Sequence, residues 1–380
     1  EATASIPQGD HDPVVLVEHT VIDMSGADCG IELTPFSTGY NARLYGVTVT
    51  GGASGSYGII LNTEGTGSTP WAVVDSCQVS GLTMGVGIQV VEHSPRIGKG
   101  TVSGCKTGID LAGYGSPVVD AGADTLFLAG NTTGLVAADD VVAEVTGVRI
   151  TNPSGGTGLF TTDSAQGTFS GLVITGGGTG IKAESDSVHT VRDSKVTQFT
   201  SYGVNVSVGG RVDLGTTGDA GNNSIYPDGT SPTRYVNAKN HLAELGPVMA
   251  ELNWWGADPP PSTKFTTSTV DYTPWLTEDP LQGLVLFLEV ARVVEAPRVW
   301  ASPNPSRDVV RLRLLGVTGE AEVSVYDLRG REVRRWREPA AAELVWDGRN
   351  GQGGLMPPGV YFVRVGWSGG SQTVKVIRGR

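Results

Sequence analysis

A glycine followed by an aliphatic residue recurs at regular intervals through the first 204 residues of the chain. Successive pairs lie 21 to 29 residues apart. The eight pairs are Gly30-Ile31, Gly58-Ile59, Gly87-Ile88, Gly108-Ile109, Gly134-Leu135, Gly158-Leu159, Gly180-Ile181 and Gly203-Val204. A repeat of this length predicts a solenoid, because each short repeat can bury its apolar residues only against its neighbours.

The residues after each glycine alternate as in a β-strand. The first and third positions after the glycine are almost all aliphatic, whereas the position between them is mixed. The mixed residues are Glu32, Ile60, Gln89, Asp110, Val136, Phe160, Lys182 and Asn205. This period of two predicts a strand with two inward columns and one outward column. We expect each glycine to supply a positive φ at the corner where its strand starts.

A second short strand precedes most of the glycines, as at residues 47–49, 148–150 and 172–174. Two or three strands per repeat predict a parallel β-helix, whose coils stack about 4.8 Å apart. Leucine-rich repeats have a similar period, but the regular Leu and Asn positions that they need are absent. The 55 glycines among 380 residues agree with a fold made of strands and turns.

Two other classes are excluded. The longest apolar stretch, residues 284–294, contains Glu289 and Arg292, so no segment is long and apolar enough for a transmembrane helix. The three cysteines, Cys29, Cys77 and Cys105, cannot all pair, so a disulfide framework is excluded and we expect buried free thiols.

The end of the repeat array carries motifs of its own. They are Asp213-Leu214-Gly215, Gly221-Asn222-Asn223, Asn253-Trp254-Trp255-Gly256 and the segment from Val270 to Leu276. Together with the repeats, they resemble the secreted, pectin-lyase-like family of right-handed parallel β-helix proteins. A solenoid end exposes its core, so we expect Trp254, Trp255 and Trp275 to form a cap. A sugar-stacking platform is the alternative.

The last 84 residues alternate more cleanly, as in residues 309–314, 322–326, 359–365 and 372–377, and about seven short strands predict a β-sandwich. Four motifs occur in order: residues 302–306 (SPNPS), 325–333 (VYDLRGREV), 346–348 (WDG) and 358–362 (PGVYF). They resemble the C-terminal sorting domain of type IX secretion, which is related to the immunoglobulin-like domain of the flagellar hook-capping protein. The resemblance implies export by a Gram-negative bacterium, with contacts to the secretion machinery. It places the protein outside the cell or on the outer-membrane surface.

The sequence therefore predicts an all-β chain of two modules. We expect a right-handed parallel β-helix with a terminal cap over residues 1–280, a linker over 281–296 and an immunoglobulin-like sandwich over 297–380. Charge divides in the same way. Residues 1–290 hold 12 Lys and Arg against 30 Asp and Glu, whereas residues 291–380 hold 15 against 9. The acidic module argues against nucleic acid as a partner.

Acidic residues collect after the glycine-anchored strands. Asp139 and Asp163 fall in one column of the repeat, and Asp140 and Asp186 fall in the next, beside Glu184. Stacked carboxylates repel unless they are protonated or bridged by a cation, and Ca²⁺ takes six to eight oxygen ligands. One hypothesis is that these five residues bind Ca²⁺, the one cofactor that the sequence suggests. The alternative is a solvated acidic ridge.

Many β-helix proteins of the resembled family cleave polysaccharides on an outer face. Lys195 and Arg192 follow the strand that carries Glu184, and a β-eliminating lyase needs a basic residue beside a neutralised uronate. These two residues are the catalytic candidates, with a surface ion-pair ladder as the alternative. Phe160 and Lys182, in the outward column, are the candidate carbohydrate contacts.

Three functions remain. The leading one is an exported, non-catalytic surface protein that binds a polysaccharide or cell-surface glycan, or acts as an adhesive or assembly scaffold. The second is a polysaccharide lyase or glycoside hydrolase acting on the β-helix face. The third is a filament subunit that self-associates through head-to-tail stacking of β-helix ends.

Overall fold

A computed structural model describes residues 14–24, 27–33, 41–52, 55–62, 72–92, 94–121, 125–282, 298–302, 304–307, 309–315, 320–339, 344–367 and 370–379. The chain divides into two compact units, Glu1–Leu284 and Val285–Arg380. Most of the linker expected over residues 281–296 lies outside the described residues.

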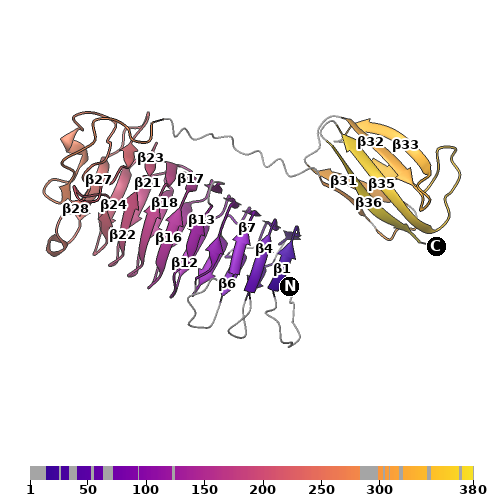
Figure 1. Ribbon diagram of the computed structural model, residues 1–380, viewed down its shortest axis with the longest axis horizontal. Coiled ribbons are helices and arrows are strands. Elements are labelled where there is room, and N and C mark those ends of the chain that lie inside the picture. Colours follow the sequence, from indigo (N-terminus) through magenta and orange to yellow (C-terminus); the bar gives the residue numbers. More distant parts are fainter. Residues whose placement is uncertain are drawn as a thin grey trace. The chain divides into compact units, whose positions relative to one another are not determined.

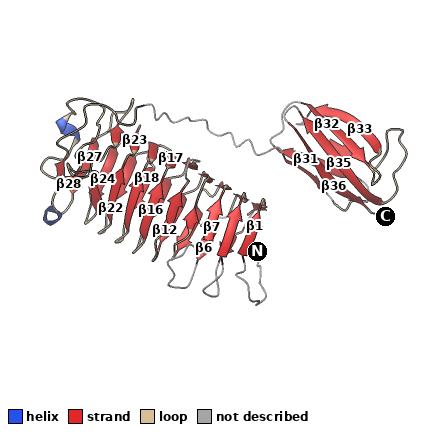
Figure 2. Cartoon of the chain, viewed as in Figure 1, coloured by secondary structure: helices blue, strands red, loops and turns tan. Residues whose placement is uncertain are grey.

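The first unit is a stack of coils with three strands each, which form three parallel sheets along its length (Figures 1 and 2). Sheet A contains β1 (Val14–Glu18), β4 (Asn41–Tyr45), β7 (Ala72–Asp75), β10 (Arg96–Ile97), β13 (Val118–Asp120), β16 (Val142–Thr146), β19 (Gln166–Ser170), β22 (Val188–Arg192), β25 (Arg211–Asp213), β28 (Val248–Met249) and β29 (Val270–Asp271).

The other two sheets have nine strands each. Sheet B contains β2 (Val21–Asp23), β5 (Thr48–Thr50), β8 (Cys77–Ser80), β11 (Gly100–Ser103), β14 (Leu126–Ala129), β17 (Val148–Asn152), β20 (Val173–Gly176), β23 (Lys195–Thr197) and β26 (Ser224–Tyr226). Sheet C contains β3 (Cys29–Leu33), β6 (Tyr57–Asn62), β9 (Val86–Val91), β12 (Thr107–Ala112), β15 (Thr133–Ala137), β18 (Thr157–Thr161), β21 (Thr179–Ala183), β24 (Tyr202–Ser207) and β27 (Arg234–Asn240).

The strands of sheet C are the ones that contain the repeating glycines. The register of this sheet confirms the alignment of the repeats. Ile109 pairs with Leu135, and Leu135 pairs with Leu159 on the next coil. All three are buried, and they form one of the two inward columns of the core. The mixed position alternates with them and so faces outward. The core is therefore built of stacked aliphatic layers, as the period of two predicts.

The repeating glycines do not have the positive φ expected of them. Each is the second residue of its sheet C strand rather than a corner residue, as Gly158 is in β18. A Cβ on Gly158 would stand 2.4 Å from Cγ2 of Ile174 and 2.6 Å from the carbonyl oxygen of Gly180. The glycine is thus needed for the close approach of sheet C to sheet B and to the next coil, not for its backbone conformation.

Aromatic side chains cover the last coil. Trp255 is fully buried and packs edge-to-face on Phe265, with ring centroids 4.9 Å apart. Phe265 in turn stacks on Tyr272 at 3.9 Å, and Trp275 Nε1 donates a hydrogen bond of 2.9 Å to Asp258. Two short 3₁₀ turns, η1 (Ala243–Leu245) and η2 (Ser262–Lys264), lie in the same region. Trp255 and Phe265 therefore cover the core at this end of the β-helix, whereas Trp254 and Trp275 are only partly buried.

The second unit has two antiparallel sheets. Sheet D contains β30 (Arg298–Ser302), β31 (Val310–Leu315) and β34 (Leu344–Trp346), and sheet E contains, in spatial order, β33 (Glu332–Pro339), β32 (Glu320–Tyr326), β35 (Gly359–Trp367) and β36 (Gly370–Arg378). The sheets share one buried core, to which Trp346 contributes from sheet D and Tyr361 from sheet E. This is a β-sandwich, so the predicted all-β fold of a parallel β-helix followed by a small sandwich is confirmed.

The cysteines are free. Cys77 and Cys105 are buried, and Cys29 is partly buried. Burial raises the pKa of both the Cys77 and the Cys105 thiol to about 11, so these thiols stay protonated and unreactive near neutral pH.

Candidate functional site: a groove on sheet A

A groove with a volume of about 720 Å³ runs across the outer face of sheet A in the C-terminal half of the β-helix. Six neighbouring strands, from β13 to β28, contribute residues to it. Five spacings of about 4.8 Å make it roughly 24 Å long, which suits an extended chain lying across the strands. Its volume is within the usual range of ligand sites in proteins.

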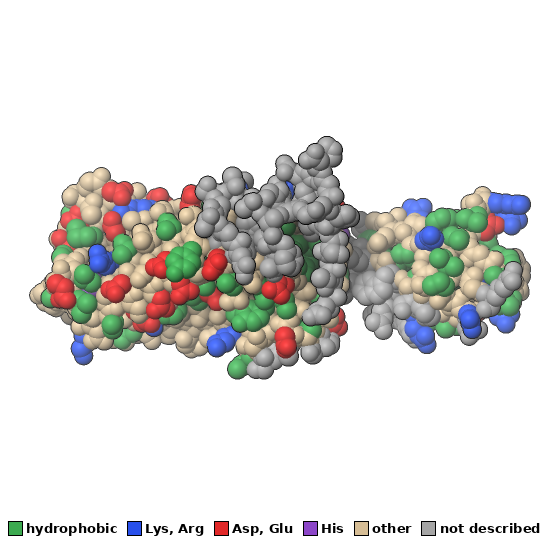
Figure 3. All heavy atoms as spheres, turned by 90° about the horizontal axis from the view of Figure 1, so that it is seen from below, with side chains coloured by type: hydrophobic (Ala, Val, Ile, Leu, Met, Phe, Trp, Pro, Cys, Tyr) green, Lys and Arg blue, Asp and Glu red, His purple; other side chains and the backbone are tan. Residues whose placement is uncertain are grey.

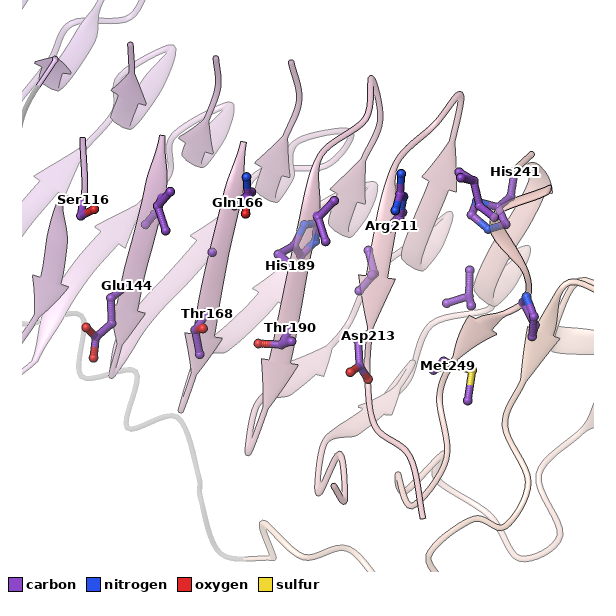
Figure 4. Close-up of a pocket in the computed structure, with 18 of the residues that line it drawn as sticks. Ser116, Glu144, Gln166, Thr168, His189, Thr190, Arg211, Asp213, His241 and Met249 are labelled. Atoms are coloured by element: carbon purple, nitrogen blue, oxygen red, sulfur yellow. The ribbon is translucent and has the colours of Figure 1, made fainter. Parts of the chain in front are cut away.

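Two columns of outward side chains line the groove. Figure 4 shows Glu144, Thr168, Thr190, Asp213 and Met249 following one another on successive strands. The register places each of them opposite the next. The stacking of coils thus turns residues 22 to 36 positions apart in the sequence into neighbours on one surface.

The second column is more apolar. It consists of Val142, Gln166, Val188 and Arg211, which also pair in register. Val142 and Val188 are 47% and 40% exposed, which is high for valine on a folded surface. His241, Leu245 and Pro247, from the segment around η1, line the groove beyond β25. The surface therefore alternates apolar patches with amide, hydroxyl and charged groups.

The charges in the groove nearly balance. Glu144 and Arg211 are both exposed, and Asp213 binds Arg192 Nη2 at 3.0 Å. Burial would lower the pKa of Arg192, but hydrogen bonds and charge from Asp219 and Asp213 outweigh it and raise the pKa. The groove therefore presents no strong net charge to a ligand.

His189 lies beneath the groove and faces the core. Its Nδ1 is 3.2 Å from Oγ1 of Thr161, its ring packs edge-to-face against Phe169, and only 3% of the residue is exposed. Burial lowers its pKa to about 3, so the imidazole is neutral at physiological pH. His189 thus acts as a core residue of the sheet that carries the groove.

The five carboxylates proposed to bind Ca²⁺ lie in the turns that follow β15, β18 and β21. Asp139, Asp163 and Asp186 have positive φ values of 58°, 52° and 63°. Aspartate tolerates this conformation better than most residues, which gives these positions a structural reason for their acidic side chains. Asp139 also accepts a hydrogen bond of 3.0 Å from the backbone N–H of Gly113.

The structure does not gather these carboxylates into a cation site. Glu184 forms an ion pair with Lys182 at 2.9 Å. In the part of the chain that the structure describes, no group of three or more His, Cys, Asp or Glu side chains is arranged to hold a metal ion. Asp140 lies in the same ridge of turns as the other four.

The two catalytic candidates lie on different sheets. Arg192 ends β22 in sheet A, where it binds Asp213 and Asp219. Lys195 begins β23 in sheet B, outside the groove, and its ammonium is 3.4 Å from the Asp279 carboxylate. Both cations therefore have carboxylate partners within the protein.

Phe160 and Lys182 pair in register on the outer face of sheet C. The Lys182 ammonium lies over the Phe160 ring, 4.5 Å from its centroid. The two candidate carbohydrate contacts are thus brought together, on a face other than the one that holds the groove. Lys182 covers part of the aromatic surface that a sugar would need.

The groove itself was not predicted, because the glycine repeat draws attention to sheet C. The sheet A strands have no anchoring motif, and their lengths range from two to five residues. One feature of the sequence could have indicated the groove. The sheet A strands β16, β19, β22 and β25 begin at intervals of 22 to 24 residues, with Val142, Gln166, Val188 and Arg211.

Comparison with known proteins gives limited likeness. No known family model matches the chain, and no curated protein matches it. Among solved structures, dimeric latent PorU from Porphyromonas gingivalis is 26% identical over 22% of this chain, with a TM-score of 0.19. PorZ, described as an essential bacterial surface component of the type-IX secretion system of the same organism, is 27% identical over 22% of this chain, also with a TM-score of 0.19. The chain spans only 9% of PorU and 11% of PorZ.

A third structure covers nearly the whole chain. The enzymatically active domain of tailspike protein 2 from bacteriophage CBA120 aligns with 96% of this chain and 72% of its own, at 10% identity and a TM-score of 0.32. Separately, none of the helices in the described ranges has the length and apolar character needed to cross a membrane.

Proposed function

We propose that this protein is an exported, non-catalytic glycan-binding protein of the cell surface, and that the groove on sheet A holds the glycan. The observation that carries the proposal is the groove itself, an elongated surface of about 720 Å³ lined by alternating apolar and polar side chains. A sugar chain has apolar ring faces and hydroxyl rims at regular intervals. The valines suit the ring faces, and Gln166, Thr168 and Thr190 suit the hydroxyl groups.

The charges of the groove favour a neutral glycan. Glu144 and Arg211 carry opposite charges, and Asp213 is bound to Arg192. A strongly anionic polymer would need an excess of cations along the groove to replace its counterions, and a cationic one would need an excess of acids.

The geometry favours binding over cleavage. Glu144 and Asp213 lie in one column with Thr168 and Thr190 between them, so three strand spacings, about 14 Å, separate their strands. Glycoside hydrolases use carboxylates roughly 5 to 10 Å apart. Lys195, the candidate lyase base, lies on sheet B and is bound to Asp279.

Export and surface attachment rest on the C-terminal module. Its four ordered motifs resemble those of a type IX sorting domain, and its fold is the small β-sandwich that such a domain requires. In this proposal the β-helix displays the groove, and the C-terminal module supplies the secretion signal and the anchor.

The first experiment is binding of the full chain to a panel of neutral and charged polysaccharides by glycan array, followed by calorimetry on each hit. Arg211→Ala and Gln166→Ala change the groove, and Phe160→Ala changes the outer face of sheet C. We expect the two groove variants to weaken binding about 10-fold, since each removes a hydrogen-bonding side chain, and Phe160→Ala to leave it unchanged.

The same hits are incubated with the protein and assayed for new reducing ends and for unsaturated products. The proposal expects binding without product. Product formation from any hit would replace it with a polysaccharide-cleaving enzyme, and loss of binding in Phe160→Ala alone would move the site to sheet C.

A further inference from the structure

Cationic and aromatic side chains gather on the outer face of sheet E. The inward residues of β32, β35 and β36, such as Val323, Val363 and Val376, form the core of the sandwich. The alternate residues point away from that core. They are Glu322, Ser324 and Tyr326 on β32, Phe362 and Arg364 on β35, and Thr373 and Lys375 on β36, with Arg335 and Arg337 facing the same way on β33.

Two cations on this face have no carboxylate partner among the residues that the structure describes. Arg335 binds Glu332 at 2.5 Å, and Arg337 binds Glu322 at 3.2 Å, so these charges are matched. Within the described ranges, Arg364 donates only to the hydroxyl of Ser371, at 3.1 and 3.3 Å, and Lys375 forms no side-chain ion pair. The face therefore carries an excess positive charge at Arg364 and Lys375.

Aromatic rings stand beside the two unmatched cations. Tyr326 pairs directly across the strands with Phe362, and Phe362 pairs with Lys375. Phe362 lies on the solvent-facing side of the sheet, and 37% of this large apolar residue is exposed. Thr373 pairs with Arg364 in the neighbouring row and supplies an exposed hydroxyl group. Among the described residues, this surface thus joins two aromatic rings, two cations without a carboxylate partner and one exposed hydroxyl.

We propose that this face is a second glycan-binding surface, separate from the groove, and that it takes an anionic polysaccharide. The aromatic rings suit the apolar faces of sugar rings, and the Arg364 fork and the Lys375 ammonium pair with carboxylate groups along the polymer. Charge complementarity supports this occupant, since residues 291–380 hold 15 cations against 9 acids in a protein whose net charge is −12. Figure 3 shows Lys and Arg distributed over the C-terminal unit and Asp and Glu over the β-helix.

An acidic protein segment is the other class of partner with the same charge. The exposed aromatic pair favours the glycan, because backbone amides of a peptide do not need flat rings set between two cations. A chain with both surfaces would hold a neutral glycan in the groove and an anionic one on sheet E.

The test uses the full chain and three probes: polygalacturonate, its fully methylated and uncharged ester, and polyglutamate. Binding is measured by calorimetry at low and high NaCl. We expect polygalacturonate to bind and the ester to bind at least 10-fold more weakly, with an affinity that falls as salt screens the charges. Arg364→Gln and Lys375→Gln should each weaken binding about 10-fold.

Arg307→Gln is the matched control, because it removes an exposed positive charge that lies before β31 and outside the face. Phe362→Leu keeps an apolar side chain but removes the ring, and we expect it to weaken polygalacturonate binding while leaving the melting temperature unchanged. Arg364→Gln and Lys375→Gln variants that bind as tightly as Arg307→Gln would overturn the proposal.

Two further outcomes would also overturn it. Polyglutamate binding as tight as polygalacturonate binding, with Phe362→Leu unaffected, would assign the face to an acidic protein. Loss of polygalacturonate binding in Thr190→Trp, a groove variant, would assign the anionic glycan to sheet A instead.

Discussion

The ammonium of Lys195 lies 3.4 Å from the carboxylate of Asp279, and this ion pair joins β23 to the segment that leaves the solenoid. Both side chains are largely buried, at 14% and 13% exposed. Lys195 also reaches the carbonyl oxygen of Leu281 at 3.4 Å, and Ser224 donates a hydrogen bond to Asp279. A residue that sequence reasoning proposed for catalysis thus fastens the exit segment to sheet B.

We predict that Lys195→Met destabilises the protein by about 3 kcal/mol, because it leaves a mostly buried carboxylate without its cation. The double variant Lys195→Met/Asp279→Leu should recover much of that loss, since it removes both charges. Urea denaturation of the two single variants and the double variant measures the coupling. A cost below about 0.5 kcal/mol would make this an ordinary surface ion pair.

We predict that replacing one of the repeating glycines by alanine destabilises the β-helix. Gly158→Ala places a Cβ within 2.6 Å of both Ile174 and the Gly180 carbonyl, so the coils must shift. We expect a loss of about 2 kcal/mol or more, similar to overpacking elsewhere in protein cores. Gly218→Ala is the control, because its Cβ would meet nothing closer than 3.9 Å. Equal melting temperatures for the two variants would contradict the close-approach explanation.

We predict that replacing the buried carboxyl of Asp110 by an amide stabilises the folded protein. Burial, with a contribution from the charge of Asp139, raises the pKa of its carboxyl to about 6. The folded state therefore holds this proton more tightly than the unfolded chain. Protonated Asp110 stabilises the fold below about pH 4, and this stabilisation is lost as pH rises through 6. Asp110→Asn should raise stability above pH 6 by up to about 3 kcal/mol.

Asp163→Asn is the matched control for Asp110→Asn, because it makes the same change at an exposed turn position. At pH 7.5 its denaturation midpoint should match that of the wild type. A midpoint at pH 7.5 that is no higher in Asp110→Asn than in wild type would show that the carboxylate is not destabilising.

We predict that His189 makes folding stability depend on pH in the opposite sense to Asp110. Its folded pKa of about 3 lies below that of the unfolded chain, so the unfolded state binds the extra proton between about pH 3 and 6.5. The contribution of neutral His189 to the free energy of unfolding is full above pH 6.5. Below that pH it falls by about 1.4 kcal/mol per pH unit. His189→Leu should flatten the decline between pH 6 and 4. An unchanged slope in this variant would place the acid sensitivity elsewhere.

The core was predictable because stacking makes the sequence repeat itself. The positions of Ile109, Leu135 and Leu159 after their glycines fix both the strand and the face that each occupies. The reason for the glycine was not predictable from the repeat. A positive φ and a close contact both exclude a Cβ, and only the three-dimensional approach of Ile174 to Gly158 distinguishes them.

The site was harder to predict than the fold. Asp139 and Asp163 lie in the turns after successive sheet C strands, but a column in the repeat does not say whether carboxylates converge on one point or project into water. The groove depends on short sheet A strands that carry no motif, and on the segment around Leu245, which lies more than 50 residues after Val188 in the chain. Such a site follows from the stacking of coils, not from local sequence.

The most direct test of the account compares two threonines of one coil. Thr190 lines the groove from β22, whereas Thr179 is a half-buried residue of β21 on sheet C, outside the groove. For a glycan that the wild-type protein binds, calorimetry on Thr190→Trp and Thr179→Trp asks which face holds it. We predict that Thr190→Trp abolishes binding by filling the groove, whereas Thr179→Trp binds as wild type does. Unchanged binding in Thr190→Trp would contradict the assignment of the groove as the glycan site.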